Sequence, residues 1–208
     1  MGRPGIRKRH RPLLAPSKAR PAGCCKGLTL VEVLTTLAVA GILVTAASGG
    51  ATQLVEQHHA GAAVNQMLGA IRFARHAAVA QRSFVTLCPR SGTLCGRRNT
   101  WHNGALVFLD RDANGRFDGS DVVLRRMPPL RDGDRFYWRS FRNRAYLMIR
   151  PNGLTDWQNG NILYCPQSGD PRFARQIVIN AQARARHARD SDGDGIVEDA
   201  RGRAVKCP

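Results

Sequence analysis

Two short stretches of the sequence place oxygen-bearing side chains at every second position and a glycine at the sixth. They are Asp110-x-Asp112-x-Asn114-Gly115-x-x-Asp118 and Asp190-x-Asp192-x-Asp194-Gly195-x-x-Glu198. This spacing is typical of calcium-binding loops. Neither stretch completes an EF-hand, because the twelfth position is Asp121 in the first and Arg201 in the second. Turns that join strands use the same residue types and are the alternative. The candidate calcium ligands, in the second stretch, are Asp190, Asp192, Asp194 and Glu198.

Arginines near the C-terminus have the chemistry to contact phosphate. A guanidinium group can donate two parallel hydrogen bonds to phosphate oxygens. The basic residues of this region are Arg172, Arg175, Arg184, Arg186, His187 and Arg189, followed by Arg201, Arg203 and Lys206. We take four of them as candidate DNA-binding residues, namely Arg175, Arg184, Arg186 and Arg189. The alternative is that these arginines only keep a strand edge soluble.

A second group of arginines alternates with aromatic residues between positions 125 and 150. It contains Arg125, Arg126, Arg131, Arg135, Arg139, Arg142, Arg144 and Arg150, with Phe136, Tyr137, Trp138 and Phe141 among them. Aromatic rings beside arginines can stack on the bases of single strands. The same alternation is typical of a half-buried strand, and we favour that interpretation.

Six cysteines divide into an N-terminal pair, Cys24 and Cys25, and four later ones. An even number outside the cytoplasm favours disulfides, and four cysteines allow three pairings. Cys88 with Cys95 would close a short loop, and Cys165 with Cys207 would tether the C-terminal tail. Zinc is the rival interpretation, but the spacing of "CPRSGTLC" is not that of a zinc knuckle.

Charge and motifs limit the function. The net charge is +17, and the first 27 residues hold eight basic and no acidic residues, which leaves 24 basic and 15 acidic residues in the rest. A chain that stays basic without these first 27 residues favours polyanionic partners. The sequence lacks the nucleophile-elbow, zinc-protease and P-loop patterns. We therefore expect a non-enzyme, with no cofactor apart from the calcium hypothesis.

The segment 28–47 is apolar or small apart from Glu32 and its threonines. About 20 such residues can cross a membrane as a helix, and the basic residues before them predict a cytoplasmic N-terminus. A carboxylate inside a membrane costs roughly 2.5–3.5 kcal/mol unless it has a partner. If the chain is cut after Gly27, the new amine of Leu28 lies one helical turn from Glu32, and neighbouring subunits could pair amine with carboxylate.

Gly27-Leu28-Thr29-Leu30-Val31-Glu32 resembles the signal sequence of type IV pilins and type II secretion pseudopilins. The resemblance implies cleavage after Gly27 by prepilin peptidase, N-methylation at Leu28 and a role for Glu32 in docking into the filament. Leu28 stands where the family usually has phenylalanine. An ordinary secretory signal, cut near Ser48, is the alternative.

The rest of the chain predicts one long helix followed by a sheet. Val64, Met67, Leu68, Ile71, Ala74 and Ala78 recur at helical spacing, and we expect a bend or local melting at Gly49, Gly50 and Gly61. Short apolar runs divided by turn residues predict strands at 83–89, 104–110, 121–127, 136–141, 145–151, 161–166 and 175–181. The fold class is α+β, with a long N-terminal hydrophobic helix packed on an antiparallel β-sheet.

The stretches "IRFARHAAVAQRSFVTLCP", "WHNGALVFLDRDANGRFD" and "CPQSG" resemble the globular domain of FimT-type minor pilins and GspH-type pseudopilins. FimT-type pilins that bind DNA carry Gly-Arg-x-Arg after a late strand, and Ala183-Arg184-Ala185-Arg186 stands at the matching place. Alanine avoids positive φ, which argues against a left-handed turn at Ala183. Gly202-Arg203-Ala204-Val205 is a weaker second match.

The expected organisation is a basic leader at 1–27, a long helix at 28–82 with a membrane span at about 28–48, and a β-rich domain at 83–208 with a tail from about 188. The resemblance implies a type IV pilin-like subunit of the inner membrane, with a periplasmic domain, that later enters a pilus or pseudopilus. Expected partners are other pilins or pseudopilins, prepilin peptidase, the inner-membrane assembly platform, membrane lipid before assembly, and DNA during natural transformation. A pseudopilin of type II secretion and a purely structural subunit are the alternatives.

Overall fold

The structure is a computed structural model that describes residues 27–208, apart from the side chains of 46–51. The first 26 residues, with most of the leader and with Cys24 and Cys25, lie outside the described residues. The chain divides into two units, residues 1–46 and 47–208. The second unit contains both sheets and the part of the helix that packs on them.

One helix, α1 (Leu30–Gln81), accounts for 52 residues. It starts at Thr29, whose hydroxyl accepts a hydrogen bond from the N–H of Glu32 at 3.2 Å and so satisfies a free N–H of the first turn. The expected local melting at Gly49, Gly50 and Gly61 is wrong, because the helix runs through all three. The cost of about 1 kcal/mol per helical glycine is not enough to interrupt it. The expected bend stays a prediction.

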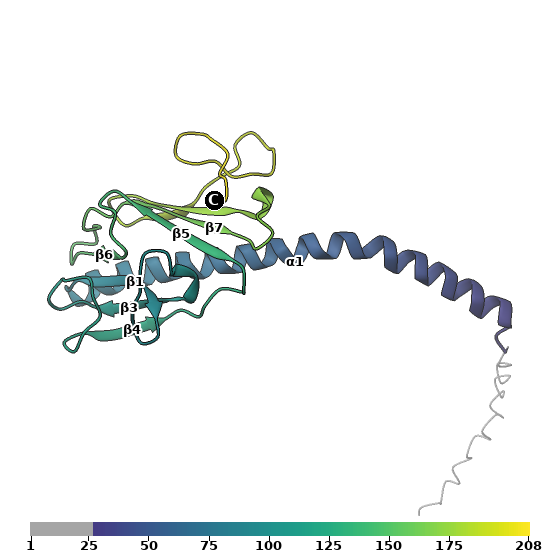
Figure 1. The fold of residues 1–208 in the computed structure, drawn as a ribbon, viewed down its shortest axis with the longest axis horizontal. Helices are drawn as coiled ribbons and strands as arrows, with labels where there is room; N and C mark the ends of the chain where they lie inside the picture. The colour runs from purple at the N-terminus through teal and green to yellow at the C-terminus, as the bar shows by residue number, and fades with distance from the viewer. Residues whose placement is uncertain (1–26) are drawn as a thin grey trace, which may run out of the picture. The chain divides into compact units, whose positions relative to one another are not determined.

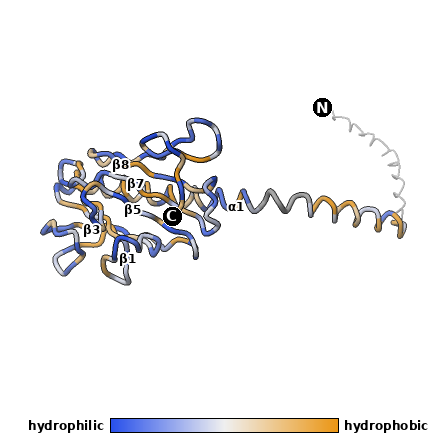
Figure 2. Tube along the Cα trace, turned by 45° about the horizontal axis from the view of Figure 1, so that its top comes forward, coloured by the Kyte–Doolittle hydropathy of each residue, from blue (hydrophilic) through white to orange (hydrophobic). Residues whose placement is uncertain are grey.

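The N-terminal stretch of α1 is hydrophobic (Figure 2), and its large apolar side chains are exposed. No helix in the described part of the chain is both long enough and apolar enough to cross a membrane. The span predicted at about 28–48 extends into residues 46–48, whose side chains lie outside the described residues.

The strands form two antiparallel sheets rather than the single sheet expected from the sequence (Figure 1). The first sheet has the order β2-β1-β3-β4, with β6 also paired to β1. Its strands are β1 (Val85–Ser91), β2 (Leu94–Cys95), β3 (Ala105–Leu109), β4 (Val122–Arg126) and β6 (Leu147–Ile149). A short 3-10 helix, η1 (Trp101–Asn103), precedes β3.

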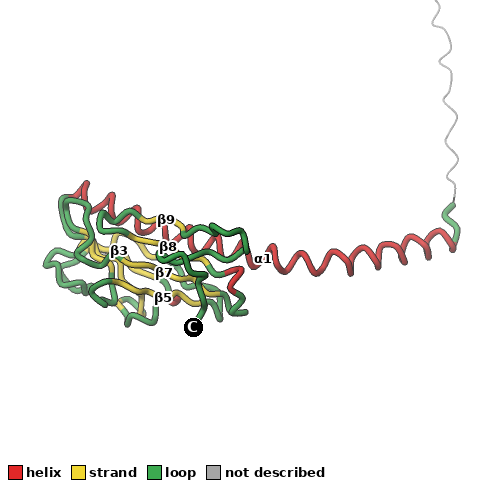
Figure 3. The backbone as a smooth tube through the Cα atoms, turned by 90° about the horizontal axis from the view of Figure 1, so that it is seen from above, coloured by secondary structure: helices red, strands yellow, loops and turns green. Residues whose placement is uncertain are grey.

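The second sheet has the order β5-β7-β8-β9, and its strands lie side by side in Figure 3. They are β5 (Arg135–Ser140), β7 (Gly160–Cys165), β8 (Arg175–Ile179) and β9 (Ala185–His187), with the 3-10 helix η2 (Pro171–Phe173) before β8. Sequence periodicity did not predict β2 or β9. Both are short, and "ARH" has no apolar run to mark β9.

The main core lies between α1 and the inner faces of both sheets. The six helical positions singled out by their spacing are all buried, and they pack in one cluster with residues such as Leu87, Phe136 and Ile177. On the outer face of the second sheet, the tail after β9 contributes Val197 and Val205 to a separate cluster with Leu163. The tail therefore covers part of a sheet face that would otherwise be exposed.

A polar network ties α1 to the second sheet. Arg131 binds Glu56 of α1 at 2.9 Å and Asp134 at 3.2 Å. The buried Asp134 also accepts hydrogen bonds from the Tyr164 hydroxyl at 2.7 Å and the N–H of Gln167 at 3.0 Å. Burial and the hydrogen bond to Asp134 raise the pKa of Tyr164, because both favour the protonated hydroxyl that donates to Asp134.

Candidate functional site

The residues predicted to be processed lie at the start of the described chain. Gly27 and Leu28 are exposed and lie before the helix, and no atom lies within 4 Å of a Cβ built on Gly27. Glu32 is exposed in the first turn of α1. Because it stands three residues after Thr29, it occupies the acidic position of a Thr-x-x-Glu capping box. The Thr29 hydroxyl makes its half of this box, a cap that was missed in the sequence although the spacing was visible.

Two disulfides hold the β-rich domain, and both pairings were among those left open. Cys88 and Cys95 join β1 to β2 across a sequence separation of 7. Cys165 at the end of β7 joins Cys207 in the tail across a separation of 42. The second bond fixes the tail to the outer face of the sheet that it covers.

The first acidic turn, residues 110–121, connects β3 to β4. Asp110 is fully buried, and its carboxylate accepts hydrogen bonds from the Thr86 hydroxyl at 2.6 Å and from the N–H groups of Asn114 and Gly115 at 3.0 and 2.9 Å. Burial raises the pKa of Asp110 despite these donors, because it favours the neutral acid. A Cβ on Gly115 would collide with the Tyr146 ring, so this turn requires glycine.

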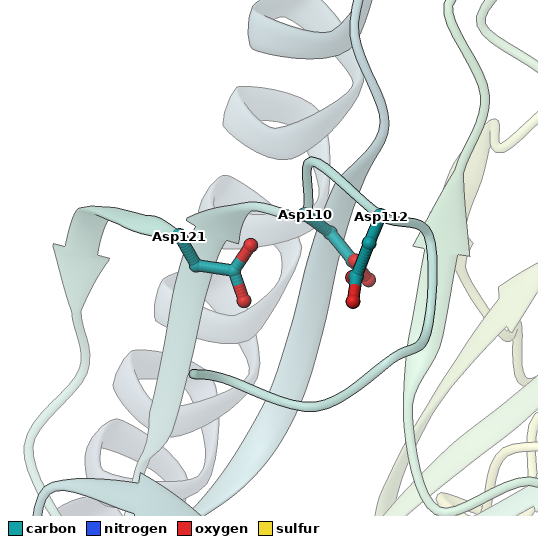
Figure 4. A group of neighbouring side chains, drawn as sticks. All are labelled: Asp110, Asp112 and Asp121. Atoms are coloured by element: carbon teal, nitrogen blue, oxygen red, sulfur yellow. The ribbon is translucent and has the colours of Figure 1, made fainter. Parts of the chain in front are cut away.

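Three carboxylates meet in this turn. One oxygen each from Asp110, Asp112 and Asp121 lies within 4.8 Å of the others. Figure 4 shows the three side chains on their loop. Asp121 also accepts hydrogen bonds from the N–H groups of Arg111 at 3.0 Å and Asp118 at 3.1 Å, which closes the loop. Beside the turn, Phe117, Tyr146 and the Cys88–Cys95 disulfide line a cavity of about 570 Å³.

The second acidic turn, residues 190–198, lies in the tail and is exposed. Asp190 accepts hydrogen bonds from the N–H groups of Gly193 at 2.7 Å and Gly195 at 2.9 Å. Asp190, Asp192 and Asp194 bring one oxygen each within 4.8 Å. Glu198, the fourth predicted ligand, is not in this group; it accepts the N–H of Ser191, and this bond lowers the pKa of Glu198.

Both turns have the chemistry to hold a hard cation through carboxylate oxygens. In the first turn, the N–H and hydroxyl donors around Asp110 already stabilise a buried carboxylate. In the second, the three aspartates face solvent. The predicted calcium ligands are therefore brought together in part, as three of the four.

Arg184 and Arg186 are exposed on either side of Ala185, whose side chain is buried in the main core. Arg184 lies in the turn between β8 and β9, and Arg186 lies on β9. In this turn the Ala183 N–H donates to the Asn180 carbonyl at 3.0 Å, and the Arg184 N–H donates to the Asn180 side chain at 2.9 Å. Ala183 adopts φ +52°, so the expectation that alanine prevents a left-handed turn is wrong. Its buried side chain and these hydrogen bonds outweigh the local preference.

The other two predicted phosphate ligands do not join this pair. Arg175 opens β8, at the far end of the strand from the β8–β9 turn, and its guanidinium donates to the carbonyls of Arg172 at 2.7 Å and Ala174 at 2.8 Å. Arg189 is exposed but directly precedes the acidic turn. The four candidates therefore form one pair and two separate residues.

The aromatic residues of β5 are arranged as a half-buried strand requires. Phe136 and Trp138 are buried, whereas Arg135 and Arg139 are exposed. These two rings cannot stack on bases. Two other rings are exposed, those of Phe141 and Trp157. Trp157 was missed in the sequence; a lone tryptophan within the polar, turn-rich stretch "PNGLTDWQNGN" was the available signal.

Two protein-family models match this chain. A model of the prokaryotic N-terminal methylation motif matches residues 23–48. A second model, described as type II transport protein GspH, matches residues 63–183, more than half of the chain. The chain belongs to the GspH family. It is thus a minor pilin or pseudopilin, and its tail after residue 183 lies beyond the GspH match.

Two solved structures are similar to this chain, and both are of the type IV minor pilin FimU from Pseudomonas aeruginosa, in two crystal forms. The first shares 19% identity, covers 66% of this chain and 92% of FimU, and gives a TM-score of 0.48. The second shares 16% identity over 62% and 92% of the two chains, with a TM-score of 0.46. A sequence search of curated proteins finds no significant match.

Proposed function

We propose that this GspH-family protein is a minor type IV pilin that binds DNA non-specifically for uptake in natural transformation. Arg184 and Arg186 are the residues that contact DNA phosphates. The observation that carries the proposal is their exposure on both sides of the buried Ala185. No carboxylate of the described residues forms a salt bridge with either guanidinium. Their charge is therefore free for a polyanion.

Assembly into a filament depends on the N-terminal end of the chain. Prepilin peptidase cuts after Gly27, Leu28 becomes the methylated N-terminus, and Glu32 pairs with the N-terminal amine of a neighbouring pilin. Before assembly the N-terminal helix holds the protein in the inner membrane, with the β-rich domain in the periplasm. Exposure of Gly27 and Glu32 and the methylation-motif match support this route. N-terminal sequencing tests it: Leu28 supports it, whereas a start near Ser48 identifies an ordinary secreted protein.

DNA binding is tested with the full-length protein in detergent micelles. Fluorescence anisotropy with a labelled 30-bp duplex, at several salt concentrations, gives the affinity and its salt slope. Each lost phosphate contact on duplex DNA lowers the salt slope by about 0.9. The double variant Arg184→Gln, Arg186→Gln is therefore expected to lower the slope by about 1.8.

The matched control is Arg125→Gln, Arg126→Gln, which removes the same charge from two exposed residues of β4. It is expected to bind nearly as the parent protein does. If both double variants lose affinity equally, binding follows net charge alone and the assignment to Arg184 and Arg186 fails.

The second candidate is a structural subunit of a type II secretion pseudopilus, or of a pilus without a DNA-binding role. The GspH match over residues 63–183 favours it. Absence of DNA binding by the folded parent protein would select it. A deletion strain that loses secretion, but keeps transformation, would identify the pseudopilus.

A further inference from the structure

Trp157 differs from the other two tryptophans of the chain. Trp101 and Trp138 are buried, with 0% and 3% of their surface exposed, whereas Trp157 is 55% exposed. Its backbone adopts φ +65°, a conformation that bulky residues rarely occupy. The loop 150–159 therefore holds a large ring toward solvent at a conformational cost.

The residues beside Trp157 hold it in place. Gln158 is buried, and its side chain accepts a hydrogen bond from the N–H of Met148 at 3.0 Å. Asp156 donates its N–H to the Met148 carbonyl at 3.0 Å and pairs through its carboxylate with Arg150. Both neighbours of Trp157 are thus tied to Met148, the middle residue of β6. The ring is presented by a braced loop and needs little ordering on binding.

A second exposed ring and a guanidinium come from the loop that is hydrogen-bonded to this one. Phe141, 75% exposed, donates its N–H to the carbonyl of Asn159 at 3.0 Å, which joins the loop 141–146 to the loop of Trp157. The Arg142 guanidinium lies 5.7 Å from the centre of the Trp157 ring. We call Phe141, Arg142 and Trp157 the aromatic tip. It combines aromatic rings with a cation, as single-strand binding surfaces do.

The aromatic tip continues to the turn that presents Arg184. Thr155, two residues before Trp157, donates its N–H to the Ala181 carbonyl at 2.9 Å. The loops 141–146 and 150–159 and the turn 180–184 together contain four arginines and one acid, Asp156, which is paired with Arg150. This end of the domain is therefore complementary in charge to a phosphate backbone.

We propose that the aromatic tip binds single-stranded DNA, with unpaired bases stacking on Trp157 and Phe141 while Arg142 and Arg184 contact phosphates. The proposal rests on the DNA-binding function above for its ligand class and specifies the strand state. Bases of a duplex are already stacked on each other and cannot reach these rings, whereas every unpaired base has a free face. Exposed aromatics with arginine also occur at protein interfaces. The charge of the surrounding loops favours DNA.

Trp157 supplies its own reporter, since the other two tryptophans are buried. The full-length protein in detergent micelles is titrated with a 30-nucleotide oligo-dT and with a 30-bp duplex. We expect oligo-dT to bind more tightly and to quench tryptophan fluorescence. Trp157→Ala is expected to weaken oligo-dT binding about tenfold, within the range for loss of one stacked base, and to change duplex binding less than twofold.

Four further variants make the test selective. Trp157→Gly removes the ring and suits the positive φ, so it covers the case in which the alanine variant does not fold. Trp157→Phe keeps a ring and is expected to retain most of the oligo-dT affinity. Arg125→Gln is the matched control for Arg142→Gln. Arg125, on β4, also lies over a ring, because its guanidinium is 5.4 Å from the centre of the Phe73 ring.

The outcomes separate the two proposals. Quenching together with a selective loss in the Trp157 variants supports single-strand binding. Duplex binding that needs Arg184 and Arg186, but ignores Trp157 and Phe141, overturns this inference and leaves the proposed function standing. Absence of binding to either DNA overturns both. A Trp157 variant that changes only self-association or pilin binding overturns the inference in favour of a protein interface.

Discussion

The two acidic turns share a sequence pattern and a hydrogen-bond pattern but not an environment. In each, the first aspartate accepts the N–H of the glycine at 2.9 Å, through Asp110 and Gly115 or Asp190 and Gly195. In each, the third-position aspartate accepts the N–H of the fifth residue, at 3.3 and 3.2 Å. Only Asp110 is buried, with the Thr86 hydroxyl as a further donor.

Local residue spacing therefore specifies the conformation of each turn, whereas the segments around the turn specify its role. The first turn joins two strands of a sheet and is closed by Asp121 at its twelfth position. The second belongs to the tail and is closed by Glu198 at its ninth. We interpret the first as part of the framework of the domain and the second as an accessory loop that depends on its tether.

Loss of the Cys165–Cys207 disulfide, which holds the tail, has the largest expected effect on stability. Cys165→Ser with Cys207→Ser opens a loop of 42 residues, and chain entropy predicts a loss of about 4 kcal/mol in the free energy of unfolding. Cys88→Ser with Cys95→Ser opens a loop of 7, with an expected loss of about 2 kcal/mol. Denaturant unfolding gives both values. Hydrogen exchange is expected to accelerate in residues 190–198 of the first variant and not in 110–121; equal acceleration in both turns contradicts the comparison.

The first aspartate of each turn gives the next largest effect. Asp110→Ala leaves the Thr86 hydroxyl and the Gly115 N–H without their acceptor and removes one of the two acceptors of the Asn114 N–H. We expect a loss of about 3 kcal/mol in the free energy of unfolding. Asp190→Ala removes an acceptor that water replaces, so a loss below about 1 kcal/mol is expected. Urea unfolding of the two variants measures the difference. Similar losses would mean that burial does not distinguish the turns.

The calcium hypothesis predicts a smaller effect confined to the second turn. Weak extracellular calcium sites have dissociation constants of about 0.1–1 mM, so about 10 mM calcium would stabilise the protein by roughly 1–3 kcal/mol. The melting temperature is compared in calcium and in chelator. Asp192→Asn is expected to abolish the shift, whereas its counterpart Asp112→Asn is expected to retain it. No shift in the parent protein excludes the hypothesis.

The smallest effect is the opposite pH dependence of the two turns. The raised pKa of Asp110 means that the folded state holds its proton more tightly than the unfolded state. Its contribution to stability is therefore full below the ordinary pKa of aspartate and is lost as pH rises through the raised value. The lowered pKa of Glu198 has the reverse sign: its contribution is present above the ordinary pKa of glutamate and is lost as pH falls through the lowered value.

Carboxyl NMR titration of the two residues tests this pair. Asp110 is expected to titrate above the usual range of aspartate and Glu198 below that of glutamate. A titration of Asp110 at or below the usual range of aspartate would show that its hydrogen-bond donors outweigh its burial.

The sequence predicted features that depend on nearby residues. The buried stripe of α1 follows from helical spacing, and the seven apolar runs each overlap a strand. The division into two sheets could not be predicted, because strand pairing is decided between segments far apart in the chain. The burial of Asp110 is equally non-local, since Thr86 comes from β1 and Tyr146 from the loop before β6.

The candidate site shows the same limit. Arg184 and Arg186 were identified from their spacing, and both are exposed. Their separation from Arg175 follows from the direction of β8, and the exposure of Trp157 follows from hydrogen bonds to β6. Neither the separation of the arginines nor the exposure of Trp157 can be predicted from residue types alone. Ala183 shows the converse, because a propensity that is correct on average was overridden by its surroundings.

The network of Glu56, Arg131, Asp134 and Tyr164 has a mechanical consequence. In a filament built from N-terminal helices, a load on the β-rich domain must pass into α1. The charged contact between Glu56 and Arg131 and the hydrogen bond between Asp134 and Tyr164 lie on that route, in parallel with the apolar helix–sheet packing. A pull along the helix axis would shear many of these contacts at once instead of peeling them one by one. The attachment of the domain to its helix is therefore loaded in shear, with many contacts sharing the force.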